Sequence, residues 1–261
     1  KENLLKLVRG LSINKPILIE GSPGVGKTTI IQNIAKKINK KIHRINLSEH
    51  TDMIDLIGSD FPTDENSGGG EKGGAPGAQN SGITFKWIPG VFLKAMINGD
   101  WIIIDEMNLA SQSILEGLNS VLDYRRSIYV SELNKEFKAH ENFQIFATQN
   151  PVNQGGGRKF LPKSFLNRFV KIYLNDMTIE DYEEILGNMY PFLDKEIVRK
   201  LTLFNLSCQK IVFRKFKLNM NEIGEYNLRT LTKIFDYMEK YANDNNNNFG
   251  ENDNDNDKDK D

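Results

Sequence analysis

The stretch Gly21-Ser22-Pro23-Gly24-Val25-Gly26-Lys27-Thr28 decides the fold. It matches the pattern G-x-x-x-x-G-K-[ST] at every fixed position, and it lies between a β-branched run at 16–20 and apolar residues with helical spacing at 28–38. In that context the glycines let backbone N–H groups curve around phosphate oxygens, and the N-terminus of the helix adds a favourable dipole. The stretch therefore predicts a phosphate-binding loop, and an ordinary glycine turn before a helix is the poorer explanation.

The loop also suggests which side chains bind a nucleotide and its metal ion. Lys27 would reach the β- and γ-phosphates, and the Thr28 hydroxyl would coordinate Mg²⁺. The predicted nucleotide-binding set is Gly21, Ser22, Pro23, Gly24, Val25, Gly26, Lys27, Thr28 and Thr29. We therefore expect ATP and Mg²⁺ as cofactors.

A second motif combines an apolar strand with two acids. The run Trp101-Ile102-Ile103-Ile104 is typical of a strand buried in a parallel sheet, and Asp105 and Glu106 follow it. Such a strand carries its last residues to the edge where open α/β sheets bind ligands. Asp105 would hold Mg²⁺, directly or through water, and Glu106 would polarise the attacking water as a general base. A strand that ends at a solvated turn explains the pattern less well once the phosphate loop is present.

Three further polar residues are candidates for catalysis. Asn150 follows a strand-like run at 143–147 and could hydrogen-bond both the γ-phosphate and the attacking water, but a turn-forming Asn before Pro151 explains the spacing equally well. Arg168 or Arg229 could stabilise the charge of the transferred phosphoryl group, which is worth about 10³–10⁵ in rate. Charge alone does not assign either arginine, because any surface arginine can pair with a nearby acid.

Strand patterns alternate with helix patterns along most of the chain, which predicts an α/β fold with a parallel sheet flanked by helices and a small C-terminal helical lid. Apolar strand runs occur at 16–20, 42–47, 101–104, 143–147 and 170–174, and helical spacing occurs at 28–38 and 113–123. We expect a nucleotide-binding core at 1–175 with a flexible glycine-rich insertion at 63–82, a helical lid at 176–242 and a disordered tail at 243–261.

Composition excludes several classes of protein. The chain has 261 residues and a formal charge of −1, so no specific DNA binding is expected. The segment 243–261 has six Asp and one Glu against two Lys, a local charge of −5, so residues 1–242 carry +4. No apolar run reaches the roughly 18 residues of a membrane span. The single cysteine, Cys208, cannot form an internal disulfide, which fits a reducing compartment.

The order of these motifs resembles an AAA+ ATPase module and, more closely, the modules of the midasin family, dynein-like ATPases of ribosome maturation. The resemblance covers about residues 1–240. Its most specific stretches are Arg44-Ile45-Asn46-Leu47-Ser48-Glu49-His50-Thr51-Asp52, Asp55-Leu56-Ile57-Gly58-Ser59-Asp60 and Asp105-Glu106-Met107-Asn108-Leu109-Ala110-Ser111-Gln112-Ser113. Further matches are Leu115-Glu116-Gly117-Leu118-Asn119 and Gln149-Asn150-Pro151 with Gly155-Gly156-Gly157-Arg158-Lys159, and Pro162-Lys163-Ser164-Phe165-Leu166-Asn167-Arg168-Phe169 closes the core. It implies that Asn150 is the sensor-1 residue, that Arg168 is an arginine finger acting on an adjacent module, and that Arg229 is the sensor-2 arginine of the lid. It also implies β-hairpins near 83–87 and at 128–137.

By the same resemblance we expect an ATP-binding and hydrolysing module of a midasin-type mechanoenzyme. Its partners would be neighbouring AAA+ modules of the same giant chain, in a ring of six, and the pre-60S ribosomal particle, from which it would remove assembly factors in the nucleus. No membrane partner is expected. Two alternatives remain open: a structural nucleotide-binding module without turnover, and a stand-alone MoxR-like AAA+ chaperone.

Overall fold

The computed structural model describes residues 2–63, 84–151, 159–216 and 226–250. They divide into two compact units, which we describe separately. Of the described residues, the first unit holds 2–20, 28–63, 84–149 and 159–173, and the second holds 21–27, 150–151, 174–216 and 226–250.

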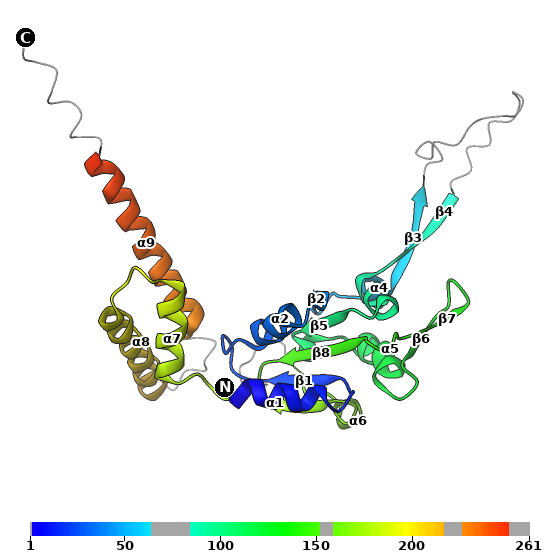
Figure 1. The fold of residues 1–261 in the computed structure, drawn as a ribbon. Helices are drawn as coiled ribbons and strands as arrows, with labels where there is room; N and C mark the ends of the chain where they lie inside the picture. The colour runs from blue at the N-terminus through cyan, green and yellow to red at the C-terminus, as the bar shows by residue number, and fades with distance from the viewer. Residues whose placement is uncertain (1, 64–83, 152–158, 217–225, 251–261) are drawn as a thin grey trace, which may run out of the picture. The chain divides into compact units, whose positions relative to one another are not determined.

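A parallel sheet of five strands forms the centre of the first unit (Figure 1). Its order is β2-β5-β8-β1-β9, and every neighbouring pair of strands is parallel. The strands are β1 (Ile17–Glu20), β2 (Ile42–Asn46), β5 (Trp101–Asp105), β8 (Gln144–Gln149) and β9 (Val170–Tyr173). Each coincides within two residues at either end with a predicted strand, so the structure confirms the predicted α/β fold with a parallel sheet.

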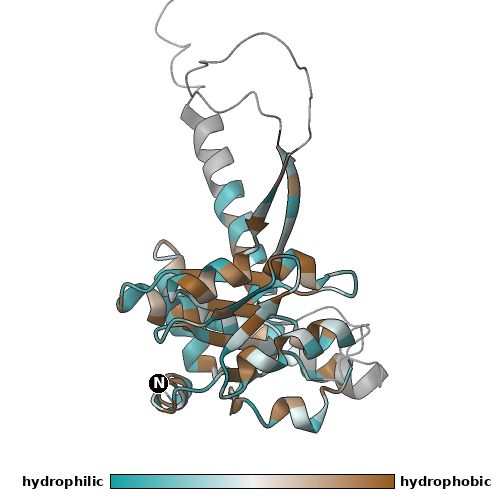
Figure 2. Ribbon diagram, turned by 90° about the vertical axis from the view of Figure 1, so that its right-hand side faces the viewer, coloured by the Kyte–Doolittle hydropathy of each residue, from teal (hydrophilic) through white to brown (hydrophobic). Residues whose placement is uncertain are grey.

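Apolar residues hold this sheet between helices. All five residues of β5 are buried, and Figure 2 shows hydrophobic segments gathered on the central strands. The flanking helices are α1 (Glu2–Leu11), α2 (Lys27–Lys37), α4 (Val91–Asn98), a 3₁₀ turn η2 (Met107–Leu109), α5 (Gln112–Leu122) and α6 (Lys163–Leu166). The α5 side chains that face the core lie at the helical spacing expected from the sequence. The hydrophobic effect therefore positions the strand ends that carry Asp105 and Gln149.

Two antiparallel hairpins extend the first unit. The short helix α3 (Met53–Ile57) leads into the hairpin of β3 (Gly58–Thr63) and β4 (Thr84–Pro89), which projects from the sheet in Figure 1 and Figure 2. The second hairpin pairs β6 (Ser127–Val130) with β7 (Lys135–Lys138). The structure confirms both predicted hairpins. Residue Thr63 belongs to β3, whereas the rest of the predicted insertion, 64–82, lies outside the described residues.

Helices make up most of the second unit. They are α7 (Ile179–Met189), α8 (Lys195–Phe216) and α9 (Leu228–Gly250). Leu186, Leu231 and Phe235 are fully buried among them. No helix among the described residues is both long and apolar enough to cross a membrane.

The end of α9 corrects the predicted start of the tail at 243. The helix continues to Gly250, so residues 243–250 are helical. Extending an existing helix adds one hydrogen bond for each residue that is ordered, so an amphipathic helix can continue into a polar segment that would not start one. The remainder of the predicted tail, 251–261, lies outside the described residues.

Candidate functional site

The loop between β1 and α2 has the backbone that a phosphate loop requires. Gly24 and Gly26 have φ angles of 79° and 84°, in the left-handed region that glycine adopts without strain. The amide of Val25 donates to the carbonyl of Ser22 at 3.3 Å, which closes a turn inside the loop. Such turns point successive backbone N–H groups into a concave surface that suits anions. The predicted glycine pattern therefore has the conformation expected of it.

Lys27 lies at the start of α2 and folds back over the loop. Its ammonium donates to the carbonyl oxygens of Gly21 at 2.7 Å and Ser22 at 3.1 Å. It also donates to Oδ1 of Asn150 at 2.6 Å, and Asn150 is buried. The structure thus brings together two predicted site residues that are 123 positions apart in the chain.

In the first unit, Asp105 is the centre of a polar cluster at the end of β5. Only 4% of the residue is exposed. Its Oδ1 accepts hydrogen bonds from the hydroxyls of Thr28 at 3.1 Å and Thr148 at 2.7 Å. Its Oδ2 accepts from Nε of Arg44 at 2.5 Å. Thr28 and Asp105, predicted from separate motifs, are therefore in direct contact.

The donor atoms of this cluster fit Mg²⁺. A hydroxyl that donates its proton to Asp105 still has lone pairs for a cation, so Thr28 and Asp105 can serve one metal ion together. Magnesium is bound in nucleotide sites by one or two protein oxygens plus substrate phosphates and water. The described residues contain no group of three or more His, Cys, Asp and Glu side chains that could hold a metal without such help. The site thus suits a metal that arrives with phosphate.

Glu106 follows Asp105 with an unusual backbone. Its φ and ψ are 56° and 45°, a left-handed conformation that costs a non-glycine residue about 1–3 kcal/mol. Its carbonyl accepts a hydrogen bond from the amide of Leu109 at 2.8 Å, which fixes the η2 turn. One carboxylate oxygen, Oε2, is buried. The turn therefore holds this carboxylate at the carboxyl edge of the sheet, where the sequence places the general base.

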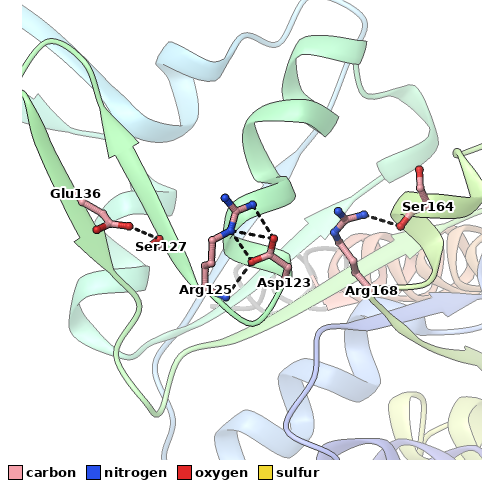
Figure 3. A network of polar contacts seen from close by, with 6 residues as sticks. All are labelled: Asp123, Arg125, Ser127, Glu136, Ser164 and Arg168. Atoms are coloured by element: carbon pink, nitrogen blue, oxygen red, sulfur yellow. Dashed lines mark hydrogen bonds and ion pairs between the residues drawn. The ribbon is translucent and has the colours of Figure 1, made fainter.

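Arg168 lies at the opposite edge of the sheet. It precedes β9 by two residues, next to the strand ends where β1 and β8 begin. Its Nη1 donates to the carbonyl of Ser164 at 2.6 Å, and its buried Nε has no hydrogen-bond partner among the described residues (Figure 3). Four residues of a strand span about 13 Å. Arg168 is therefore separated by the length of the sheet from Asp105 of its own chain.

A cavity of about 400 Å³ lies beside Arg168. Its charged or polar lining includes Lys15, Asp123, Arg126, Gln144 and Arg168. Hydrogen bonds from Arg125 hold the pKa of Asp123 below its usual value, and the positive charge of Arg168 acts in the same direction (Figure 3). This edge of the sheet therefore carries several cations, Lys15, Arg126 and Arg168, around one cavity.

The remaining predicted residues have less support. Thr29 and Arg229 are exposed. The predicted roles of Asn150 at a γ-phosphate, of Arg168 as an arginine finger and of Arg229 as a sensor stay predictions. Gly155, Gly156 and Gly157, which contributed to the family resemblance, lie outside the described residues.

Sequence reasoning missed three residues of these clusters. Arg44 and Thr148 contact Asp105, and Asn227 packs against the loop, where a Cβ on Gly24 would lie 2.9 Å from the Asn227 side chain. Asn227 also accepts a hydrogen bond from the amide of Thr230 at 3.3 Å, as an N-cap residue of α9 does. The preference of Asn for N-caps could have identified it, since the helical pattern begins at Leu228.

A parallel α/β sheet with a glycine loop, a lysine at the start of the following helix and an acid pair after a buried strand defines a P-loop nucleotide-binding ATPase fold. Comparison with known protein families identifies the subgroup within this class. The family model of the AAA domain (dynein-related subfamily) matches residues 16–169. The chain belongs to that family. Nucleotide and magnesium use is general in it.

Similarity to known proteins agrees with the family. The chain is 43% identical to midasin of Dictyostelium discoideum over 92% of its own length and 44% identical to midasin of Giardia intestinalis over 72%. It spans about 4% of the length of each of these relatives. The predicted resemblance to a midasin AAA module is therefore confirmed.

Two further similarities concern shorter proteins. An uncharacterized protein of Staphylococcus haemolyticus is 28% identical over 74% of this chain and 68% of its own. The crystal structure of a putative ATPase from Cytophaga hutchinsonii superposes with a TM-score of 0.53 at 21% identity, over 81% of this chain and 66% of that one. This likeness shows the fold alone.

Proposed function

We propose that the chain is an ATP-binding and ATP-hydrolysing module of a midasin-type mechanoenzyme. The observation that carries the proposal is the contact of Thr28 with the buried carboxylate of Asp105, because it joins the phosphate-loop motif to the acid motif. Glu106, which follows at the same edge of the sheet, supplies the base that hydrolysis needs. A site that only stored nucleotide would not need a base in a strained backbone, which favours turnover over a purely structural role.

Different residues of the chain would bind the phosphates, hold the metal ion and activate the water. The loop amides and Lys27 bind and orient the phosphates, and a bound Mg²⁺ supplies positive charge that favours phosphoryl transfer. Thr28 and Asp105 would hold this metal ion. Glu106 would take a proton from the attacking water, and Asn150 would position that water from its place beside Lys27. Positioning and electrostatics account for nearly all catalysis in this reaction class.

Arg168 completes the site of a neighbouring module in this proposal. Its location at the amino edge of the sheet supports action on another chain segment, since the edge with Asp105 is a strand length away. Arg229 is proposed as a second cation of the lid, serving its own or a neighbouring site.

The wider role follows from similarity to the midasins. We propose that the module acts beside further AAA+ modules in a six-module ring, in the nucleus, on pre-60S ribosomal particles from which assembly factors are removed. The support is the 43–44% identity to two midasins, of whose length the chain spans about 4%. Such a fraction suits one module of a much longer protein.

The test changes this module alone within the full-length protein that contains it. Lys27→Ala removes the ammonium that the loop holds over its phosphate-binding surface. We expect lower single-turnover ATP hydrolysis and failure to release assembly factors from pre-60S particles, with Lys36→Ala, an exposed lysine later in α2, as the control. If Lys27→Ala keeps normal ATP turnover but fails to release assembly factors, the structural role is favoured. If both turnover and release stay normal, the proposal is overturned.

A second candidate is a stand-alone AAA+ chaperone of the MoxR type. One observation favours it: the staphylococcal relative is aligned over 68% of its own length, so a protein little longer than one module exists with this sequence pattern. Its test is the size of the 261-residue chain in solution. Assembly into a ring with ATP and dissociation without it would support the stand-alone function, whereas a monomer in both conditions would argue against it.

A further inference from the structure

The guanidinium of Arg44 contacts the carboxylate of Asp105, which is also the proposed ligand of magnesium. It lies on β2, which pairs with β5 so that Arg44 is opposite Ile103 and Asn46 is opposite Asp105. Because side chains two apart on a strand share a face, Arg44 reaches along the face of Asn46 toward the end of β5. Its Nε lies 2.5 Å from Oδ2 of Asp105.

The carboxylate of Asp105 needs such a partner. Its side chain is 6% exposed, and a buried charge is costly unless another charge and hydrogen bonds compensate it. The hydroxyls of Thr28 and Thr148 donate to Oδ1 but are neutral. Arg44 provides the positive charge, and it does so at Oδ2.

A magnesium ion would compete with this arrangement. The hydroxyl of Thr28 can donate to Asp105 and ligate a cation at once, but a guanidinium and a divalent cation on one carboxylate repel each other. The Arg44 side chain is 56% exposed, so it can turn into water without opening the core. Thr28 and Thr148 would continue to orient the carboxylate.

We propose that Arg44 is the counter-ion of Asp105 in the metal-free module, that it leaves Oδ2 when Mg²⁺ binds, and that it thereby sets the Mg²⁺ concentration at which the site loads. This inference rests on the proposed ATP site. Arg44 is a positioning residue in this account, because it acts through Asp105.

The test compares Arg44→Met with the unchanged 261-residue chain. Thermal unfolding is followed while MgCl₂ is added, with a non-hydrolysable ATP analogue held at saturation. We expect the variant to unfold at a lower temperature without Mg²⁺ and to need at least about fivefold less Mg²⁺ for half of its stabilisation, since coupled sites typically differ by 5–150-fold. The matched control is Arg199→Met, which removes an arginine paired with Glu183 on the helical unit.

An unchanged or higher Mg²⁺ requirement in Arg44→Met would overturn the inference, because a residue that only orders Asp105 would aid metal binding. If Arg44→Met does not fold, Arg44→Gln is the second variant, and it must show the same lower requirement. If the unchanged chain is not stabilised by the ATP analogue at any Mg²⁺ concentration, the proposed function fails as well. If both proteins bind nucleotide and Arg44→Met has the same Mg²⁺ dependence as the unchanged chain, only the proposed role of Arg44 is overturned.

Discussion

The backbone of Glu106 is held in a left-handed conformation directly after the buried strand β5. A residue other than glycine keeps such a conformation only where its surroundings impose it, and these positions concentrate at functional sites. Here the η2 turn imposes it and holds the carboxylate at the carboxyl edge of the sheet, directly after Asp105. This local geometry supports a chemical role for Glu106.

Glu106→Gln should separate binding from chemistry. The amide has nearly the size of the carboxylate but cannot accept the proton of the attacking water, so we expect ATP affinity within about threefold of the unchanged module and a turnover lower by about 10²–10⁴. Both are measured in the assembled protein, by nucleotide fluorescence and single-turnover hydrolysis. Glu116→Gln on α5 is the control, since that residue is exposed. Unchanged turnover in Glu106→Gln would remove Glu106 from the mechanism.

At the scale of elements, a buried tyrosine joins two helices of the second unit by hydrogen bonds. Tyr190 follows α7 and is 4% exposed, and its hydroxyl donates to the carbonyl of Thr232 at 3.2 Å and to the carboxylate of Asp236, both on α9. Burial, followed by the hydrogen bond to Asp236, raises the pKa of Tyr190 to about 12. The neutral phenol is therefore the form that joins α7 to α9.

Tyr190→Phe should destabilise the chain by about 1–2 kcal/mol, because the ring stays and the hydrogen bonds to a carbonyl and a carboxylate are lost. The exposed Tyr237 provides the control Tyr237→Phe. Since the folded pKa is raised above the usual value near 10, the stabilisation is complete below about pH 10 and is lost as the pH rises through about 12. Urea unfolding at pH 8 measures the loss of stability, and an absorbance titration measures the pKa of Tyr190. Equal stability of Tyr190→Phe and Tyr237→Phe at pH 8 would refute the stabilising role of the Tyr190 hydroxyl.

Elements with strong local patterns could be predicted from the sequence. β5 is a continuous apolar run, and the phosphate loop has fixed glycines, so their type and place follow from nearby residues. Arg44 and Thr148 could not be predicted, because their contacts with Asp105 depend on the pairing of three strands from distant parts of the chain. The end of α9 was predicted too early, since composition alone ignores the helix that precedes a polar segment.

At the scale of the whole molecule, the two edges of the sheet have different tasks in the proposed assembly. The carboxyl edge carries Asp105, whereas the amino edge carries Arg168 and a cavity of about 400 Å³ with further cations. A single module then holds the metal ligands and the base of one site and the arginine of another. The proposal thus requires a neighbour for full activity.

The isolated chain should accordingly be a monomer with weak ATPase activity. Without an arginine from a neighbour, we expect turnover lower by about 10³–10⁵ than in the assembled protein. Arg168→Ala should leave the slow turnover of the monomer unchanged but lower that of the assembled protein, where Arg199→Ala should not. Sedimentation velocity and ATP turnover are the measurements. Rapid hydrolysis by a dilute monomer, or loss of the monomer's slow activity in Arg168→Ala, would contradict the account.

Every proposed role of the module requires that ATP bind through the loop and the Thr28–Asp105 pair, and titration calorimetry of the 261-residue chain with ATP and Mg²⁺ tests this binding most directly. We predict one ATP per chain, an affinity at least about tenfold lower in EDTA, and loss of binding in Lys27→Ala with retained binding in Lys36→Ala. No ATP binding by the folded chain, or equal binding by Lys27→Ala, would contradict the central claim.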